Sequence, residues 1–249
     1  YAKDKTTAVV IGGGLLGLEA ANGLKGLGLQ VFVLEHNDRI LPRQLDQEAS
    51  SLLEEKVSQY SINFLKKADT KEILGDDKVS GILLENGETI PADLVIISTG
   101  VNPNTAFAKD SGIEIKRAIV VNEKMETSVP DVYACGDCAE FEGINYALWI
   151  EALEQGKTCG INAAGGEYIF ETITPYTSLS AFNTQAFSIG DVGSNPERQY
   201  ETYRKQDDDK FLELYFTDGK LCGAILMGDI SKRGRYRSPG GSCPPPVGR

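Results

Sequence analysis

The sequence has one histidine and one tryptophan among its 249 residues, and it is poor in basic side chains. It contains 25 Lys and Arg against 36 Asp and Glu, which gives a formal net charge of -11. Because nucleic-acid-binding surfaces are basic, this balance argues against a nucleic-acid partner. No stretch approaches the roughly 20 apolar residues that cross a bilayer, so we expect no membrane partner.

The number and spacing of the cysteines favour neither a disulfide scaffold nor a metal site. Five cysteines make an odd number, which is typical of a protein kept in a reducing cytoplasm rather than of a disulfide scaffold. Cys135 and Cys138 form a CxxC pair, but the chain has no second CxxC, so we expect no metal site. Two interpretations of the pair stay open: small residues that pack beside a glycine turn, which we favour, and a redox dithiol.

What the sequence does contain is a series of short apolar runs that end in glycine or polar residues. Such runs predict buried parallel strands, and the helical spacing of apolar residues between them predicts connecting helices. We expect strands at 8–11, 30–35, 62–65 and 92–98, helices at 15–27 and after the cap Asp46, and a hairpin at 79–90 with a type I′ turn at Asn86-Gly87. This order predicts an α/β fold with a doubly wound, Rossmann-like sheet and a β-hairpin excursion.

The remainder of the chain has other patterns. Between 104 and 168 we expect strands near 119–121 and 132–134 and a helix at 147–163, whereas 172–230 alternates strand-like runs and turns, which predicts an antiparallel element. Residues 231–249 are rich in Arg, Pro and Gly, so we expect disorder there. A non-native end is the favoured explanation of this tail, and a partner-binding tail is the alternative.

A glycine motif, Gly12-x-Gly14-x-x-Gly17, lies between the first strand and the first helix. Gly12 permits the tight turn, Gly14 lets the backbone approach a pyrophosphate, and Gly17 allows the helix to pack closely on the strand. The helix start at Leu15 and Leu16 offers unpaired N–H groups and the positive end of a dipole. The motif therefore predicts a dinucleotide site.

Glu35 supports the same prediction because it ends the next strand, 18 residues after Gly17. A carboxylate at this place accepts hydrogen bonds from ribose hydroxyls and repels a 2′-phosphate. We therefore expect NADH to be preferred over NADPH. Arg39 and Arg43 lie nearby in the sequence and keep NADPH binding open.

A second motif lies in the segment 127–140, where a short apolar run delivers Gly136-Asp137. This segment resembles the second flavin-binding motif of the FAD-dependent pyridine nucleotide–disulfide oxidoreductase superfamily. Residues 98–104, with Gly100, resemble the segment that closes the NAD domain of that superfamily. Residues 148–156 resemble the helix whose N-terminus faces the flavin. The resemblance covers roughly residues 6–165.

The resemblance implies roles for individual residues. Asp137, beside Gly136, would hydrogen-bond the ribitol or pyrophosphate of FAD, and the N–H groups of Ala147, Leu148 and Trp149 would lie near the flavin. Glu19 corresponds to an acid that lies toward the nicotinamide. The alternative for Glu19 is a solvated charge on the helix surface.

The single Trp149 in its context resembles the NADH:rubredoxin reductase, nitrite reductase large-subunit and NADH oxidase branch. The only histidine, His36, is expected on the surface, so the acid–base histidine of the glutathione reductase group has no counterpart. The implied function is an FAD-dependent oxidoreductase that passes a hydride from NADH to flavin and electrons to rubredoxin or a nitrite reductase centre. The alternatives are an NADH oxidase or peroxidase acting on O₂ or peroxide, and a nucleotide-binding module without catalysis.

By this resemblance, residues 1–103 would be an NAD-binding domain, 104–168 the C-terminal segment of an FAD-binding domain, and 172–230 part of an interface domain that leaves a homodimer open. Members of the superfamily carry two dinucleotide motifs, and this sequence has one. We therefore expect a fragment whose FAD-first half would precede Tyr1. No catalytic residue can be named from the sequence.

Overall fold

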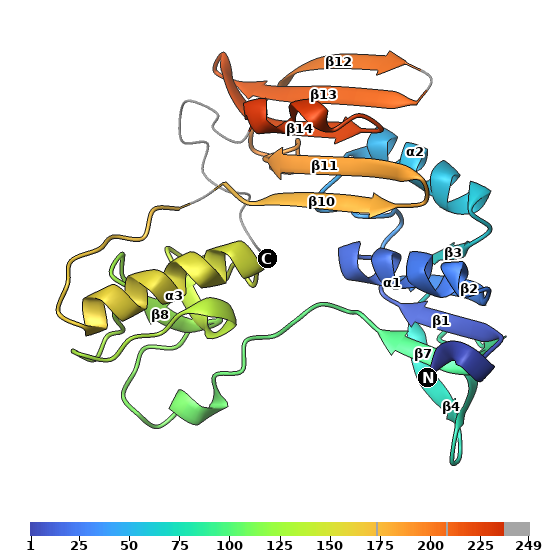
Figure 1. Cartoon of the computed structure of the whole chain (residues 1–249), viewed down its shortest axis with the longest axis horizontal. Helices are drawn as coiled ribbons and strands as arrows, with labels where there is room; N and C mark the ends of the chain where they lie inside the picture. Colours follow the sequence, from blue (N-terminus) through green and yellow to red (C-terminus); the bar gives the residue numbers. More distant parts are fainter. Residues whose placement is uncertain (173, 208, 237–249) are drawn as a thin grey trace. The chain divides into compact units, whose positions relative to one another are not determined.

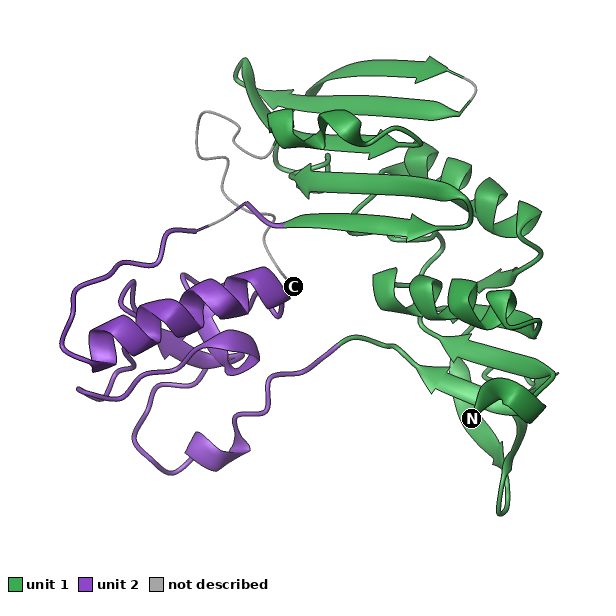
Figure 2. Ribbon diagram, viewed as in Figure 1, with its two compact units in different colours: residues 1–100, 176–247 green, residues 101–175, 248–249 purple. Residues whose placement is uncertain are grey.

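The protein is described by a computed structural model that covers residues 1–172, 174–207 and 209–236. The chain forms two compact units (Figure 2). Of the described residues, the first unit contains 1–100 and those from 176 to 236, and the second contains those from 101 to 175. Among the described residues, no helix is both long and apolar enough to cross a bilayer.

A four-stranded parallel sheet forms one half of the first unit (Figure 1). Its strand order is β3-β2-β1-β7, the order of a nucleotide-binding half of a doubly wound fold. The strands are β1 (Thr7–Ile11), β2 (Gln30–Glu35), β3 (Asn63–Lys66) and β7 (Leu94–Ile97), and the helices are α1 (Leu15–Gly26) and α2 (Gln47–Gln59). A short 3₁₀ helix, η1 (Ala2–Asp4), precedes β1. The predicted parallel α/β arrangement is thus present.

The predicted hairpin is also present, in a small antiparallel sheet of β4 (Thr70–Gly75), β5 (Val79–Leu84) and β6 (Thr89–Pro91). The predicted type I′ turn is wrong, because of its two central residues only Gly87 has a positive φ. The Leu84 N–H donates to the Glu88 carbonyl, and the Gly87 N–H donates to the Leu84 carbonyl. The loop therefore has three residues and places glycine at the left-handed position.

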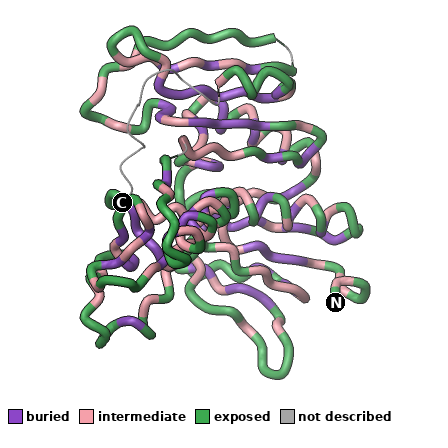
Figure 3. The backbone as a smooth tube through the Cα atoms, turned by 60° about the vertical axis from the view of Figure 1, so that its left-hand side comes forward, coloured by how far each residue is buried: buried purple, intermediate pink, exposed green. Residues whose placement is uncertain are grey.

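The other half of the first unit is a five-stranded antiparallel sheet of order β10-β11-β14-β13-β12 (Figure 1). Its strands are β10 (Tyr176–Ala181), β11 (Thr184–Gly190), β12 (Glu201–Asp207), β13 (Lys210–Thr217) and β14 (Lys220–Met227). Every residue of the edge strand β12 is exposed (Figure 3). Leu179, Phe182 and Ile225 of this half share one hydrophobic cluster with Leu18 and Leu53 of α1 and α2. The two sheets of the first unit therefore have a common core.

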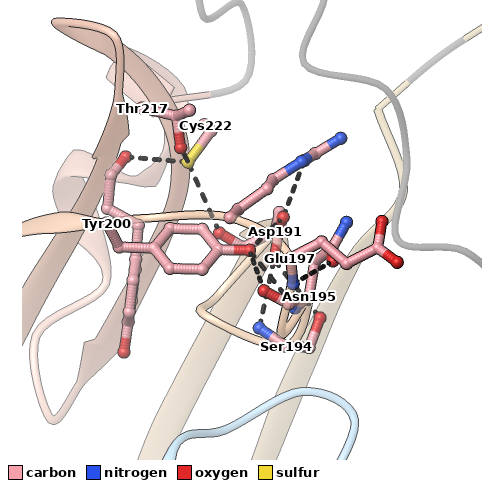
Figure 4. Close-up of polar contacts among 9 residues, drawn as sticks. Asp191, Ser194, Asn195, Glu197, Tyr200, Thr217 and Cys222 are labelled. Carbon is pink, nitrogen blue, oxygen red and sulfur yellow. Dashed lines mark hydrogen bonds and ion pairs between the residues drawn. The ribbon is translucent and has the colours of Figure 1, made fainter.

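Asp191 organises the connection from β11 to β12 (Figure 4). Its carboxylate accepts hydrogen bonds from the Ser194 N–H and hydroxyl at 3.2 Å, from the Tyr200 hydroxyl at 2.7 Å, and pairs with Arg198 at 2.7 Å. The Asp191 side chain is 0% exposed. Burial, and then the hydrogen bond with Asp191, raise the pKa of Tyr200 to about 12. A loop that lacks regular structure is thus ordered by one buried carboxylate.

The second unit has two parallel strands, β8 (Ile119–Val121) and β9 (Ala139–Phe141), and helix α3 (Trp149–Ala163). Two 3₁₀ helices, η2 (Ala106–Ala108) and η3 (Gly136–Cys138), lie along its chain. The strand predicted near 132–134 is wrong. Tyr133 forms only an isolated bridge with Glu126, and the strand forms after Gly136-Asp137 instead of before it.

The segment 231–249 was expected to be disordered because of its composition, but its first six residues form a helix. Ser231–Tyr236 form a 3₁₀ helix, η4, and Tyr236 packs against a hydrophobic cluster that includes Phe187 and Ile230. An apolar aromatic side chain within this basic segment supplies the contact. The rest of the predicted tail, 237–249, lies outside the described residues.

Candidate functional site: a glycine turn and an uncapped helix

The glycine turn after β1 is closed by backbone contacts that exclude side chains. A Cβ on Gly17 would lie 2.0 Å from the Gly12 carbonyl oxygen, and a Cβ on Gly12 would lie 2.2 Å from the Ser98 carbonyl oxygen. In contrast, a Cβ on Gly14, the N-cap of α1, would meet no atom within 4 Å. Gly12 and Gly17 therefore serve the packing of β1, α1 and β7, whereas the open side of Gly14 leaves room for a ligand to approach the backbone.

Glu35 ties this turn to the end of β2. Its Oε2 accepts the Gly13 N–H at 2.8 Å, and its Oε1 accepts the N–H and the side-chain amide of Asn37 at 2.8 and 2.5 Å. The carboxylate is 6% exposed. A carboxylate offers about four acceptor positions, so three are used here and one on Oε2 remains.

The start of α1 carries the other predicted residues of this site. Leu15 is half-buried, Leu16 is exposed and Glu19 is exposed on the helix surface. No side chain caps α1 at Gly14, so the first N–H groups of the helix are available to an anion such as a pyrophosphate. Gly100 follows β7 with a φ of 93°, a conformation suited to glycine.

In the second unit, Gly136 and Asp137 lie in η3 against α3. Gly136 has a φ of 73°, and its N–H donates to the Gln155 Oε1 at 2.8 Å. Gln155 is 1% exposed, so this hydrogen bond fixes the loop to the helix. Asp137 is exposed, and the Asn145 side-chain amide holds its backbone carbonyl at 2.9 Å. The loop thus presents the Asp137 carboxylate to solvent.

Helix α3 begins with free backbone donors. The structure gives no side-chain cap at Leu148, and the first intrahelical acceptor of this turn, the Leu148 carbonyl, receives the Ala152 N–H. Ala147 precedes it with a φ of 48°, a strained conformation for a residue with a Cβ. Trp149 is 79% exposed. An uncapped helix start after a strained residue suits an anionic group such as reduced flavin.

Two cysteines of this unit, Cys138 and Cys159, have raised thiol pKa values. Burial raises the pKa of Cys138, and burial followed by the nearby Cys135 raises the pKa of Cys159 to about 12. The Cys138 thiol donates to the Cys135 carbonyl at 3.4 Å. Because the thiolate is the reactive form, the raised pKa of Cys138 favours the packing interpretation for this member of the CxxC pair. No group of side chains in the described ranges could hold a metal ion.

His36 lies at the surface, where it pairs with Asp69. The hydrogen bond that the His36 ring donates to the Asp69 carboxylate raises the pKa of the imidazole.

Three residues that position the predicted sites were not assigned a role from the sequence. Gly13 packs its Cα side against Glu35 and Phe64, Asn37 holds the Glu35 carboxylate, and Gln155 holds Gly136. Gly13 could have been noticed in the sequence as an additional glycine between the motif residues Gly12 and Gly14. Asn37 and Gln155 act through long side chains whose direction a sequence pattern does not give.

Comparison with known proteins bears on both units. The model of the pyridine nucleotide-disulphide oxidoreductase family matches residues 1–156. The model of the rubredoxin NAD+ reductase C-terminal domain matches residues 175–238. Together these models cover the parallel sheet, the second unit as far as residue 156, and the antiparallel sheet.

Curated relatives are longer than this chain. A nitrite reductase [NAD(P)H] of Bacillus subtilis is 37% identical over 238 residues, which are 95% of this chain and 30% of that protein. An NADH-rubredoxin oxidoreductase of Clostridium acetobutylicum is 33% identical over 92% of this chain and 56% of its own length. An NADH oxidase of Methanocaldococcus jannaschii is 37% identical over 88% of this chain and 53% of its own length.

Solved structures of similar oxidoreductases also match this chain. The NADH:rubredoxin oxidoreductase of Clostridium acetobutylicum matches 94% of this chain with a TM-score of 0.78 and 32% identity, and 58% of its own chain is covered. A NAD-dependent persulfide reductase from A. fulgidus matches 94% with a TM-score of 0.86 and 31% identity, over 48% of its chain. The chain therefore belongs to the pyridine nucleotide-disulphide oxidoreductase family of NADH-dependent oxidoreductases, in the branch of the rubredoxin reductases, nitrite reductases and NADH oxidases.

Proposed function

We propose that this chain supplies the NADH site and part of the FAD site of a flavoprotein reductase that passes electrons to a protein-borne acceptor. The observation that carries the NADH site is Glu35, a buried carboxylate held by Gly13 and Asn37 with one acceptor position left. A bound FAD would supply the chemistry of hydride acceptance from NADH and onward electron transfer.

The residues of the chain have defined tasks in this function. The N–H groups at the start of α1 bind the NADH pyrophosphate, and Glu35 orients the adenosine ribose and repels a 2′-phosphate. The loop of Gly136 and Asp137 holds FAD hydroxyl or phosphate groups, and the uncapped start of α3 stabilises negative charge on the flavin. Glu19 is proposed to lie toward the nicotinamide.

The proposal for the electron acceptor rests on the family match of the antiparallel sheet and on the relatives of the chain. The match of residues 175–238 to a rubredoxin NAD+ reductase domain supports a rubredoxin-like protein, and the nitrite reductase relatives support a redox centre of that enzyme. The match to an NADH oxidase favours O₂ as the second candidate.

Anaerobic stopped-flow kinetics on the full-length gene product tests the function. We expect NADH to bleach the yellow flavin absorbance, and oxidised rubredoxin or a nitrite reductase centre to restore it faster than O₂ or peroxide does. Faster recovery with O₂ or peroxide would support the oxidase function instead. A colourless protein that added FAD does not convert would leave only a nucleotide-binding module.

Replacing Glu35 with glutamine tests the NADH preference. The amide nitrogen of Gln cannot accept the Gly13 N–H, and the negative charge that repels a 2′-phosphate is gone. We expect NADH to bind roughly 10–100-fold more weakly, since hydrogen bonds to charged groups are worth about 1.5–3 kcal/mol. We also expect a smaller ratio of NADH to NADPH affinity, both measured by isothermal titration calorimetry.

Glu55→Gln is the matched control, because Glu55 is exposed on α2 and removal of its charge leaves the turn intact. Equal affinity of the unaltered protein for NADH and NADPH would contradict the proposed role of Glu35.

A further inference from the structure

One edge of the antiparallel sheet is formed by β12, which among the described residues pairs with β13 alone (Figure 1). The strand has 7 residues, all exposed, and it pairs with β13 from end to end without a register shift. It also contains no proline. Natural edge strands are often kept short or interrupted by proline or a bulge, because their outward N–H and C=O groups can pair with another strand. β12 lacks these three protections.

Charge is the remaining protection of edge strands, and β12 carries both signs of charge in a symmetrical order. Side chains two residues apart along a strand lie on one face of the sheet. Glu201, Tyr203 and Lys205 therefore share a face, with the acid and the base at equal distances on either side of the ring. Tyr203 is 55% exposed. Such a face is complementary to itself after a rotation of 180°.

The other face of β12 is already engaged. Arg204 lies opposite Glu213 of β13 and donates to its two carboxylate oxygens at 3.0 to 3.2 Å. Arg204 also pairs with Glu48 of α2. Tyr203 instead lies opposite Leu214, which packs against the hydrophobic cluster on the other side of the sheet. Arg204 thus holds β12 in place and leaves the face of Tyr203 and the outer edge for a partner.

Two copies of β12 can pair with each other only in certain registers. Residues of an antiparallel strand alternate between those whose N–H and C=O groups face one neighbour and those whose groups face the other side. Because β13 engages one set, the residues of the outer set must lie opposite each other in the two copies. A twofold axis relating the copies therefore passes through a residue and not between two residues.

Strand length and charge leave one register. Only axes at Tyr203, Arg204 or Lys205 overlap five or more residues of each strand. An axis at Lys205 places lysine against lysine. An axis at Arg204 places arginine against arginine, and Glu201 against Asp207. Since like charges directly opposite are destabilising, both of these registers are disfavoured.

We infer that β12 is a self-complementary interface at which two copies of this chain pair antiparallel about Tyr203, so that their two five-stranded sheets become continuous. In this register Glu201 of each copy lies opposite Lys205 of the other, and the two tyrosine rings meet at the axis. Opposite charges and aromatic pairs in cross-strand positions are stabilising. One strand makes a small interface, so we expect a reversible dimer. The inference does not depend on the flavin or the electron acceptor.

An exchange of charges tests this interface. Sedimentation equilibrium of the 249-residue chain at increasing concentration gives the dimerisation constant. Glu201→Lys and Lys205→Glu each turn two attractive pairs into two repulsive ones, because the axis repeats every contact. We expect either variant to weaken dimerisation by roughly tenfold or more. The double variant restores opposite charges across the axis, so its dimerisation constant should return close to that of the unaltered chain.

Lys220→Glu is the matched control, because it changes the net charge as much as Lys205→Glu does. Lys220 is exposed at the start of β14 and lies opposite Thr217 of β13, away from the β12 edge. This variant should dimerise like the unaltered chain, and circular dichroism checks that every variant is folded. A chain that stays monomeric at all concentrations would overturn the inference. So would a dimer that tolerates both single reversals, or a double variant that does not recover.

Discussion

Replacing Gly17 with alanine is expected to weaken NADH binding by roughly a hundredfold. The new Cβ would lie 2.0 Å from the Gly12 carbonyl oxygen, which is part of the backbone and cannot rotate away. Either α1 moves off β1 or the glycine turn opens, and both displace the N–H groups that would bind a pyrophosphate. Overpacking of this kind costs about 1–3 kcal/mol or more, which corresponds to roughly a hundredfold loss of affinity at the upper figure.

Gly23→Ala in the same helix is the matched control. A Cβ on Gly23 would meet no atom within 4 Å, and alanine in a helix interior is about 0.5–1 kcal/mol more stable than glycine. We expect this variant to bind NADH normally and to melt at a slightly higher temperature. Unchanged NADH titration and thermal melting of Gly17→Ala would show that the turn does not depend on the close contact.

Replacing Asp191 with alanine is expected to give the largest loss of stability among surface-loop substitutions in this chain. The change removes a fully buried carboxylate together with its ion pair to Arg198 and its hydrogen bonds from Tyr200 and Ser194. Breaking one side of a buried ion pair costs about 3–5 kcal/mol. Urea unfolding monitored by circular dichroism should show this loss.

Glu197→Ala controls for the loop itself, because Glu197 is exposed in the same connection. Its stability should stay within about 0.5 kcal/mol of the unaltered chain, as for other surface substitutions. If Asp191→Ala were no more destabilising than Glu197→Ala, the hydrogen bonds of Figure 4 would not stabilise the loop, and other contacts would hold it.

The parts of the fold that were predictable are those whose burial leaves a pattern in the sequence. β2 was predicted at its observed bounds because its side chains are nearly all buried. β12 was missed because every residue in it is exposed, and β4 because most of its residues are. An edge strand gains its place from a neighbour's hydrogen bonds, which leave no hydrophobic pattern.

The candidate site divides in the same way. Gly12 and Gly17 were predictable because close backbone contact admits only glycine, and Glu35 because its place at a strand end is fixed by chain spacing. The hydrogen bonds between Asn37 and Glu35 and between Gln155 and Gly136 could not be predicted from the sequence. These contacts depend on the direction of flexible side chains, which the packing around them decides.

The core shared by the two sheets of the first unit has a consequence for how the protein is made. Leu18 and Leu53 reach their partners Leu179 and Ile225 only after the intervening residues 101–175 have been synthesised. We therefore expect apolar side chains of α1 and α2 to stay uncovered during synthesis until the antiparallel sheet has been made. The entropic cost of closing this long loop is small, because it grows slowly with loop length. Contacts between residues so far apart in the sequence nevertheless form slowly. We expect such exposed apolar side chains to favour aggregation or chaperone binding before folding is complete.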